Sequence, residues 1–280
     1  MVVSDARPIG VFDSGIGGLT VLRALRERLP EESFVYLGDT ARVPYGTKGA
    51  DTVTRFATEA TLLLTRRNVK AVVVACNTAS AIAIDRLRTV TDLPVYGVIE
   101  PGVEAALAAT SGRVGVIGTL ATLASDRYGQ LLRAARADLV VEGKACPLFV
   151  PLAEEGWVDG GVTLAVASTY LEDLRTAGVD TLILGCTHYP ILKKAIGDVM
   201  GPDVQLVDSA LVLAEAVAAD LQRRDAQAEA GSASRLELLV SDVPQRFAEL
   251  SERFLAHPVG DVELVDLEEL MPEAMRILNT

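Results

Sequence analysis

The sequence predicts an α/β protein made of two similar parallel-sheet domains related by a pseudo-two-fold axis. Short β-branched segments alternate with helix-like apolar patterns through most of the 280 residues, which is typical of parallel sheets covered by helices. The segment IGVFDS at 9–14 is echoed 105 residues later by VGVIGT at 114–119. ACNTA around Cys76 is likewise echoed 110 residues later by GCTHY around Cys186. Nearly equal offsets indicate an internal repeat, although valine-rich strands can also resemble one another by chance.

The expected strands are short apolar runs that end at polar or glycine-containing turns. They cover residues 9–12, 34–37, 69–75, 95–98, 114–117, 139–141, 181–184, 204–207, 236–240 and 262–265. Helices are expected from apolar residues at 3.6-residue spacing. They cover residues 20–29, 79–87 and 209 to about 224, the stripes Val53–Leu64 and Leu164–Leu174, one segment between the last two strands, and the C-terminus. Residues 226–234 are small and polar and are expected to form a loop.

The repeat predicts where the domains divide. The second unit begins near the VIEP segment at 98–101, so we expect one domain at 99–208 and another at 1–98 joined by 209–280. Ligands of parallel sheets bind beyond the carboxyl ends of the strands. Two such units facing each other would place both cysteine segments in one interdomain cleft.

Composition excludes several classes of protein. The net charge of −12 argues against general nucleic-acid binding, which needs a basic face. No stretch reaches the roughly 18 apolar residues of a membrane span, and no signal-peptide pattern opens the chain. Three cysteines do not form a secreted disulfide framework. We therefore expect a cytoplasmic protein with reduced thiols and no membrane or nucleic-acid partner.

Cys76 and Cys186 each end a β-branched run and precede a helix-like pattern. A helix N-terminus favours the thiolate form of a cysteine. The expected capping residues are Asn77 or Thr78 after Cys76, and Thr187 after Cys186. A lone strand cysteine is usually an inert core residue, but two in matching turns indicate chemistry. His188 can relay a proton to Cys186, or can simply begin a helix. Cys146 and His257 lack such surroundings. We expect Cys146 to be a structural residue and His257 to lie on the surface.

Three further segments carry polar residues that could serve a site. GVFDSGIGGL runs from a strand into a glycine-rich turn, whose N–H groups suit anions; Asp13 there could face the cleft or cap a helix. The loop LGDTARVPYG contains Asp39 and offers Tyr45 and Gly46 as backbone donors. PLAEEG adds the carboxylates Glu154 and Glu155, which by themselves suggest a solvated helix start.

With these segments together, the chain resembles the glutamate racemases of the cofactor-independent aspartate/glutamate racemase superfamily. The resemblance rests on GVFDSGIGGLTVL, YLGDTARVPYG, ACNTAS, PLAEEG and LGCTHYP in consistent order. It covers nearly the whole chain, except residues 1–7 and 226–234.

The resemblance implies interconversion of L- and D-glutamate without a cofactor or metal, supplying D-glutamate for peptidoglycan, by a homodimeric enzyme. It implies that Cys76 serves D-glutamate and Cys186 serves L-glutamate as proton donor and acceptor. Catalytic support would come from Asp13, His188 and Glu154, with Glu155 as the alternative to Glu154. The implied substrate contacts are Asp13, Ser14, Tyr45, Gly46, Asn77, Thr78, Thr187 and His188, with Asp39 and Thr119 as supporting residues.

Three alternatives remain at this point. The substrate could be aspartate or another acidic amino acid handled by the same superfamily. The two cysteines and His188 could form a thiol redox or metal module, although no Cys-x-x-Cys occurs and three ligands suit structural zinc poorly. The chain could also be a two-lobed amino-acid-binding protein, which would have no need of two strand-end thiols.

Overall fold

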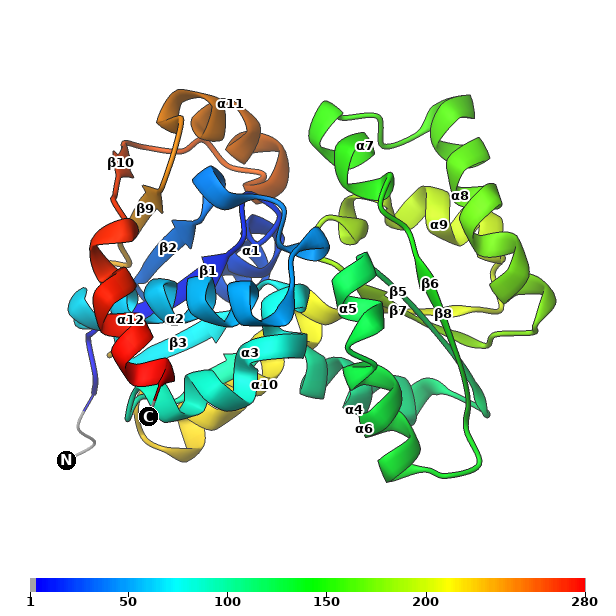
Figure 1. The fold of residues 1–280 in the computed structure, drawn as a ribbon, viewed down its shortest axis with the longest axis horizontal. Coiled ribbons are helices and arrows are strands. Elements are labelled where there is room, and N and C mark those ends of the chain that lie inside the picture. Colours follow the sequence, from blue (N-terminus) through cyan, green and yellow to red (C-terminus); the bar gives the residue numbers. More distant parts are fainter. Residues whose placement is uncertain (1–3, 280) are drawn as a thin grey trace.

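The computed structural model describes residues 4–279 and contains two parallel sheets flanked by helices (Figure 1). The first sheet has the order β10-β9-β2-β1-β3-β4 and the second β6-β5-β7-β8. The first contains β1 (Ile9–Asp13), β2 (Phe34–Gly38), β3 (Ala71–Val74), β4 (Val95–Gly97), β9 (Leu236–Val240) and β10 (Val262–Leu264). The second contains β5 (Arg113–Gly118), β6 (Val140–Ala145), β7 (Thr181–Gly185) and β8 (Gln205–Asp208). The predicted α/β class with two parallel-sheet units is confirmed.

The internal repeat is visible in the order of the strands. The run β2-β1-β3-β4 of the first sheet has the same order as β6-β5-β7-β8 of the second. In both units the first strand of the repeat pairs in parallel with the third, as Ile9 with Ala71 and Val114 with Thr181. The echoed sequences therefore lie on equivalent strands, β1 with β5 and β3 with β7.

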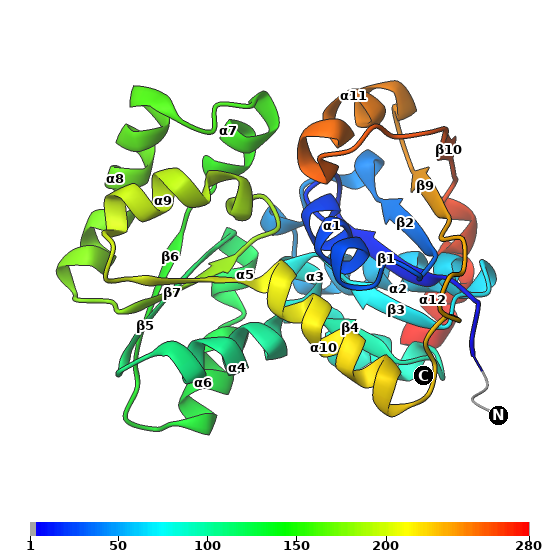
Figure 2. The same ribbon diagram turned by 180° about the vertical axis from the view of Figure 1, so that it is seen from behind.

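Helices cover both faces of each sheet. In Figure 1, α2, α3 and α12 lie in front of the first sheet, and Figure 2 shows α1 and α10 on its opposite face. The second sheet lies between α8 and α9 on one side and α4, α5 and α6 on the other (Figure 2). The helices of the first unit are α1 (Leu19–Arg28), α2 (Ala50–Arg66), α3 (Asn77–Val90), α10 (Ser209–Arg223), α11 (Pro244–Leu255) and α12 (Met271–Leu278). The others are α4 (Ile99–Ala109), α5 (Leu120–Ala124), α6 (Arg127–Ala135), α7 (Phe149–Glu155), α8 (Gly160–Thr176) and α9 (Lys193–Met200).

The central strands are apolar because both of their faces are covered. Every residue of β1, β3 and β7 is buried, as expected for parallel strands packed between helices. The second unit has an edge strand, β6, whose residues are exposed or half-buried. This difference explains why β1, β3 and β7 read as continuous apolar runs while β6 contains charged residues.

A buried ion pair joins the C-terminal part of the chain to the first sheet. The Lys70 ammonium lies 2.5 Å from Glu32, and the two side chains are 1% and 3% exposed. Lys70 also donates to the carbonyls of Asp5 and Ala226, and Glu32 accepts the Ala228 N–H. The loop that follows α10 is therefore held beside the beginning of β3.

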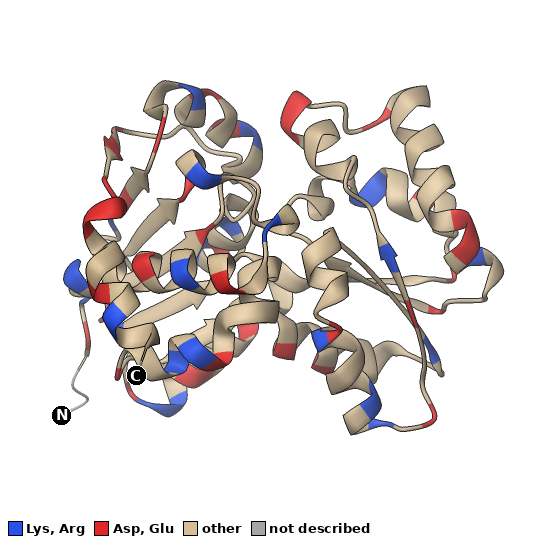
Figure 3. Ribbon diagram, viewed as in Figure 1, with Lys and Arg blue, Asp and Glu red and all other residues tan. Residues whose placement is uncertain are grey.

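The surface carries both signs of charge, interspersed over the outer helices of both units (Figure 3). Among residues 4–279, no helix is long and apolar enough to cross a membrane. Within the same range, no group of three or more His, Cys, Asp and Glu side chains has an arrangement suited to a metal ion.

Candidate active site

A cavity of about 60 Å³ lies where the carboxyl ends of the two sheets meet. Both sequence-predicted cysteines line it, Cys76 two residues after β3 and Cys186 directly after β7. The full lining is Ser14, Gly15, Ile16, Val43, Pro44, Tyr45, Gly46, Cys76, Asn77, Thr78, Thr119, Val150, Glu154, Cys186, Thr187 and His188. Segments far apart in the sequence thus contribute to one site.

Cys76 itself caps α3, which corrects the prediction that Asn77 or Thr78 would do so. The Cys76 sulfur accepts the Ala79 N–H at 3.5 Å, and Asn77 and Thr78 form the first turn of the helix. The Cys76 thiol also donates to Ser14 Oγ at 3.6 Å. The side chain is only 5% exposed. The sulfur therefore has helix and hydroxyl contacts on the protein side and the cavity on the other.

Cys186 stands beside an imidazole and a carboxylate. Its sulfur lies 3.8 Å from His188 Nδ1, and His188 Nε2 lies 3.0 Å from Glu154 Oε1. His188, not Thr187, precedes the short helix Tyr189–Leu192 in the capping position, with Pro190 in its first turn as expected. Glu154 lies at the C-terminal end of α7 and not at a helix start. Its neighbour Glu155 is exposed, so only Glu154 contacts the histidine.

The two thiols have opposite electrostatic surroundings. Burial and the nearby charge of Asp13 raise the pKa of Cys76 to about 12. Burial lowers the pKa of His188, but the Cys186 sulfur and Glu154 outweigh it and raise that pKa to about 10. The hydrogen bond from His188 lowers the pKa of Glu154. Protonated Cys76 and an imidazolium beside Cys186 are therefore the forms favoured at neutral pH.

Asp13 lies beneath the cavity and is absent from its lining. The carboxylate is 1% exposed; Oδ2 accepts the Gly15 N–H at 3.0 Å, and Oδ1 has no hydrogen-bond partner within residues 4–279. Burial raises the pKa of Asp13, against the opposing effect of His188 and the backbone N–H groups of the following turn. An unpartnered buried oxygen beside a thiol can accept a proton or orient a cationic group.

The glycine-rich turn after β1 allows the two units to approach closely. A Cβ on Gly17 would lie 2.3 Å from Thr187 Oγ1 and 2.5 Å from the His188 ring. Thr20 of the same segment donates to the Thr187 carbonyl at 2.9 Å. Contact between the turn and the Cys186 segment therefore requires glycine at position 17.

The loop after β2 brings Tyr45 and Gly46 to the cavity wall. A Cβ on Gly46 would lie 2.6 Å from the Cβ of Thr119, so the loop packs directly on the second unit. Asp39, at the start of this loop, is fully buried and does not line the cavity. It accepts a hydrogen bond from the Tyr45 hydroxyl, so it touches the site only through Tyr45.

Contacts across the site also involve residues that sequence reasoning did not select. Tyr128 donates to Asn77 Oδ1 at 2.7 Å, and the Thr78 hydroxyl lies 3.2 Å from that of Thr122. Thr119, predicted as a supporting residue, bonds Thr78 at 3.0 Å and caps α5. Tyr128 and Thr122 lie outside the motifs, and no local pattern marks them. Cys146 and His257 are absent from the cavity lining, Cys146 being buried and His257 exposed.

This geometry suits proton transfer at a single carbon. Two sulfurs reach one cavity from equivalent positions on two different sheets, and one is paired with a histidine and a carboxylate. Groups of this kind can remove a proton from one face of a bound molecule and return one to the other.

Comparison with known proteins gives a consistent result. A family model described as Asp/Glu/hydantoin racemase matches residues 10–217. A glutamate racemase of Geobacter metallireducens is 51% identical over 263 residues, covering 94% of this chain and 97% of that protein. The structure is similar to that of glutamate racemase from Francisella tularensis in complex with D-glutamate, with a TM-score of 0.89 and 39% identity, covering 95% of this chain and 99% of that one. It is also similar to the Thermus thermophilus enzyme in complex with β-chloro-D-alanine, with a TM-score of 0.86, 49% identity and coverage of 95% and 99%.

Proposed function

The chain belongs to the Asp/Glu/hydantoin racemase family, and on that premise we propose that it interconverts L- and D-glutamate by a two-thiol mechanism. The observation that carries the proposal is the meeting of Cys76 and Cys186 in one cavity. A racemase needs an acid and a base on opposite faces of the α-carbon, and two thiols can exchange these roles when the direction reverses.

The proposed reaction begins with one thiolate removing the α-proton and ends with the opposite thiol supplying a proton to the other face. The α-proton of an amino acid is far less acidic than a thiol, so the site must stabilise negative charge that develops toward the α-carboxylate. Hydroxyl and backbone donors around the cavity, at Ser14, Gly46, Thr78 and Thr187, are suited to this role. Exclusion of water then preserves the intermediate until it is reprotonated.

The unequal surroundings of the two sulfurs indicate which one acts as the base in the resting enzyme. The His188 imidazolium lies 3.8 Å from the Cys186 sulfur and can take up or supply a proton there, while the raised pKa of Cys76 keeps that thiol protonated. We assign Cys186 as the base and Cys76 as the acid in the resting enzyme. From the family resemblance, this resting form takes L-glutamate, and the form left after turnover takes D-glutamate.

The supporting groups are assigned by what they contact. Glu154 holds His188 in its charged form and orients its ring. Asp13 and Ser14 serve Cys76, Asp13 through its unpartnered oxygen and Ser14 through its hydroxyl. Asn77 and Thr78 contact the substrate from a helix N-terminus that is braced by Tyr128 and Thr119.

The proposed organisation follows the two sheets. We assign residues 1–98 and 209–280 to one domain and 99–208 to the other. The family resemblance further supports a cytoplasmic homodimer that supplies D-glutamate for peptidoglycan. Growth of a D-glutamate auxotroph carrying this gene would support that physiological role, and failure to grow despite expression of an active enzyme would refute it.

The test of the activity is a comparison of substrates. Purified protein is incubated without added cofactor with L-glutamate, D-glutamate and L-aspartate, and optical activity is followed by circular dichroism. Loss of signal from both glutamate enantiomers toward the racemic mixture is expected, with slower change for aspartate. Faster turnover of aspartate would replace the glutamate assignment with the alternative acidic substrate.

A further inference from the structure

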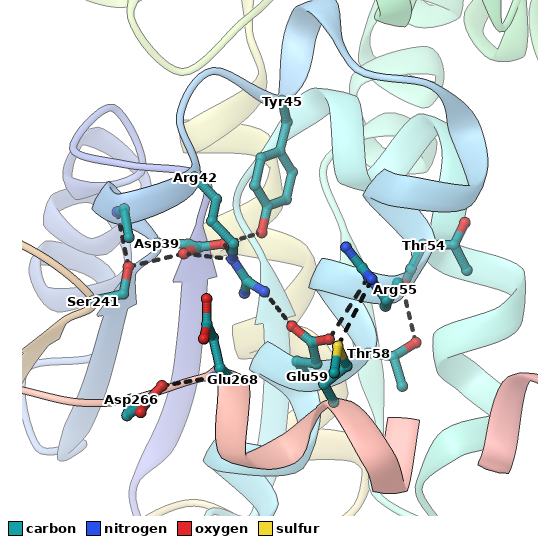
Figure 4. Close-up of polar contacts among 12 residues, drawn as sticks. Asp39, Arg42, Tyr45, Thr54, Arg55, Thr58, Glu59, Ser241, Asp266 and Glu268 are labelled. Carbon is teal, nitrogen blue, oxygen red and sulfur yellow. Dashed lines mark hydrogen bonds and ion pairs between the residues drawn. The ribbon is translucent and has the colours of Figure 1, made fainter. Parts of the chain in front are cut away.

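A cluster of buried charges lies behind the cavity wall and surrounds Arg42 (Figure 4). The Arg42 guanidinium lies in the short helix Thr40–Arg42, and its Nε bonds Asp39 Oδ2 at 2.8 Å. Its Nη1 bonds Glu59, which comes from α2. The exposed fractions of the side chains are 16% for Arg42, 0% for Asp39 and 1% for Glu59. One guanidinium thus joins two buried carboxylates from different elements.

The cluster is held on its other sides as well. The Arg42 Cζ lies 3.9 Å from the centroid of the Phe56 ring, a cation–π contact. Ser241, at the end of β9, donates to Asp39 Oδ1 at 2.8 Å. Arg55 reaches Glu59 only at 3.9 Å and is 35% exposed. In Figure 4, Asp39, Glu59 and Ser241 lie around Arg42, between the loop after β2, α2 and the end of β9.

The connection to the cavity runs through Tyr45. Its hydroxyl donates to Asp39, and its ring is fully buried. Burial and the charge of Asp39 raise the pKa of Tyr45 well above its usual value, so the hydroxyl remains a donor. Gly46 follows directly and packs on Thr119 at the cavity wall. The position of this wall is therefore set by the carboxylate that Arg42 holds.

We propose that Arg42 is a positioning residue that fixes the Tyr45–Gly46 wall for binding of the substrate carboxylate, acting through Asp39 and Tyr45. This inference rests on the proposed function. Arg42 is absent from the cavity lining, so it does not act on the substrate itself. A planar guanidinium can bond two carboxylates while its face lies on an aromatic ring, which a lysine ammonium cannot do.

The test separates binding from chemistry and from stability. Arg42→Met removes the charge, and Arg42→Lys keeps the charge without the planar guanidinium. Arg55→Met is the matched control, because Arg55 also lies beside the Phe56 ring and Glu59. We expect Arg42→Met to raise KM for both glutamate enantiomers about tenfold or more, since small misplacements of binding groups have effects on this scale. A much smaller change in kcat is expected, with an intermediate KM for Arg42→Lys and wild-type kinetics for Arg55→Met.

A double variant tests the charge argument. Arg42→Met leaves Asp39 and Glu59 without their shared cation, so adding Glu59→Gln removes one of the two uncompensated carboxylates and should recover part of the KM. If Arg42→Met does not fold, the proposal is tested by measuring KM and kcat separately for Arg42→Lys and for Glu59→Gln. Wild-type KM in every folded Arg42 variant, with only a lower melting temperature, would show a purely structural role. Failure of the wild-type protein to racemise glutamate would instead refute the proposed function.

Discussion

Cys76 and Cys186 occupy equivalent positions in the repeat, just beyond β3 and β7, yet their partners are chemically opposite. Cys76 contacts a hydroxyl and lies near the buried carboxylate Asp13, whereas Cys186 lies beside His188. A symmetric fold therefore holds an asymmetric pair of proton carriers.

Replacing either cysteine by serine should abolish racemisation, with losses of about a thousandfold or more, since a positioned acid or base contributes on this order. Values of kcat/KM for racemisation cannot reveal which face of the α-carbon each thiol serves. The equilibrium constant between enantiomers is one, so kcat/KM must be equal in both directions for every variant.

The enantiomers of β-chloroalanine can reveal the faces separately. Loss of the α-proton and the β-chloride gives an enamine that hydrolyses to pyruvate and ammonia, and only one base is needed. We expect Cys186→Ser to retain elimination from the D-enantiomer and Cys76→Ser from the L-enantiomer, measured as pyruvate. Elimination of the same enantiomer by both variants would contradict the assignment.

Glu154→Gln should shift the alkaline limb of the pH–rate profile to lower pH. The Glu154 carboxylate is one of the groups that raise the pKa of His188 to about 10. Without its charge, the imidazolium loses its proton earlier as pH rises, by about one pH unit or more. The profile of kcat/KM against pH measures the effect, and Glu155→Gln, at the exposed neighbour, is the control. If the alkaline limb does not move, the protonation state of His188 does not control the reaction.

Asp13→Asn should lower the pH at which Cys76 becomes reactive. The negative charge of Asp13 helps raise the pKa of this thiol to about 12, and asparagine has no charge. Alkylation of Cys76 by iodoacetamide in a Cys186→Ser background, followed by peptide mass spectrometry across pH, reports the midpoint. A midpoint equal to that of the parent would show that Asp13 does not act on the sulfur electrostatically.

Gly46→Ala should lower kcat/KM by about 10- to 100-fold, because an added Cβ would lie 2.6 Å from Thr119 and displace the cavity wall. Gly49→Ala is the matched control in the same loop, since an added Cβ there has no atom within 4 Å. Equal activity of the two variants would mean that the wall tolerates displacement.

Lys70→Met should destabilise the fold by about 3–5 kcal/mol, because removal of one partner leaves Glu32 as a buried and uncompensated charge. Denaturant unfolding measures the change. Arg23→Met breaks the exposed pair with Glu27, in which the side chains are 48% and 58% exposed, and should cost less than about 0.5 kcal/mol. Comparable losses in both variants would show that burial of the Lys70 pair adds nothing.

Local patterns in the sequence predict the strands, but they do not predict the helices α4 and α6, which are absent from the expected set. Each expected strand corresponds to an observed one within a few residues. Central strands such as β3 and β7 are the clearest because a strand covered on both faces is apolar along its length. The echo between 9–14 and 114–119 corresponded to a real equivalence of β1 and β5. Side-chain preference points to Asn77 or Thr78 as the cap of α3, whereas Cys76 caps it, because preference alone does not show where the helix begins.

The sequence by itself determined the α/β class, the repeat and the two cysteines, since these depend on periodicity and spacing along the chain. Only the tertiary structure decided which groups meet. It brought Glu154 and not Glu155 to His188, placed Asp13 beneath the cavity, and joined Arg42 to Glu59. These contacts connect residues from different strands, helices and loops, and their geometry is set by how those elements pack in three dimensions. No pattern along one segment of the sequence encodes the distance between side chains of two different segments.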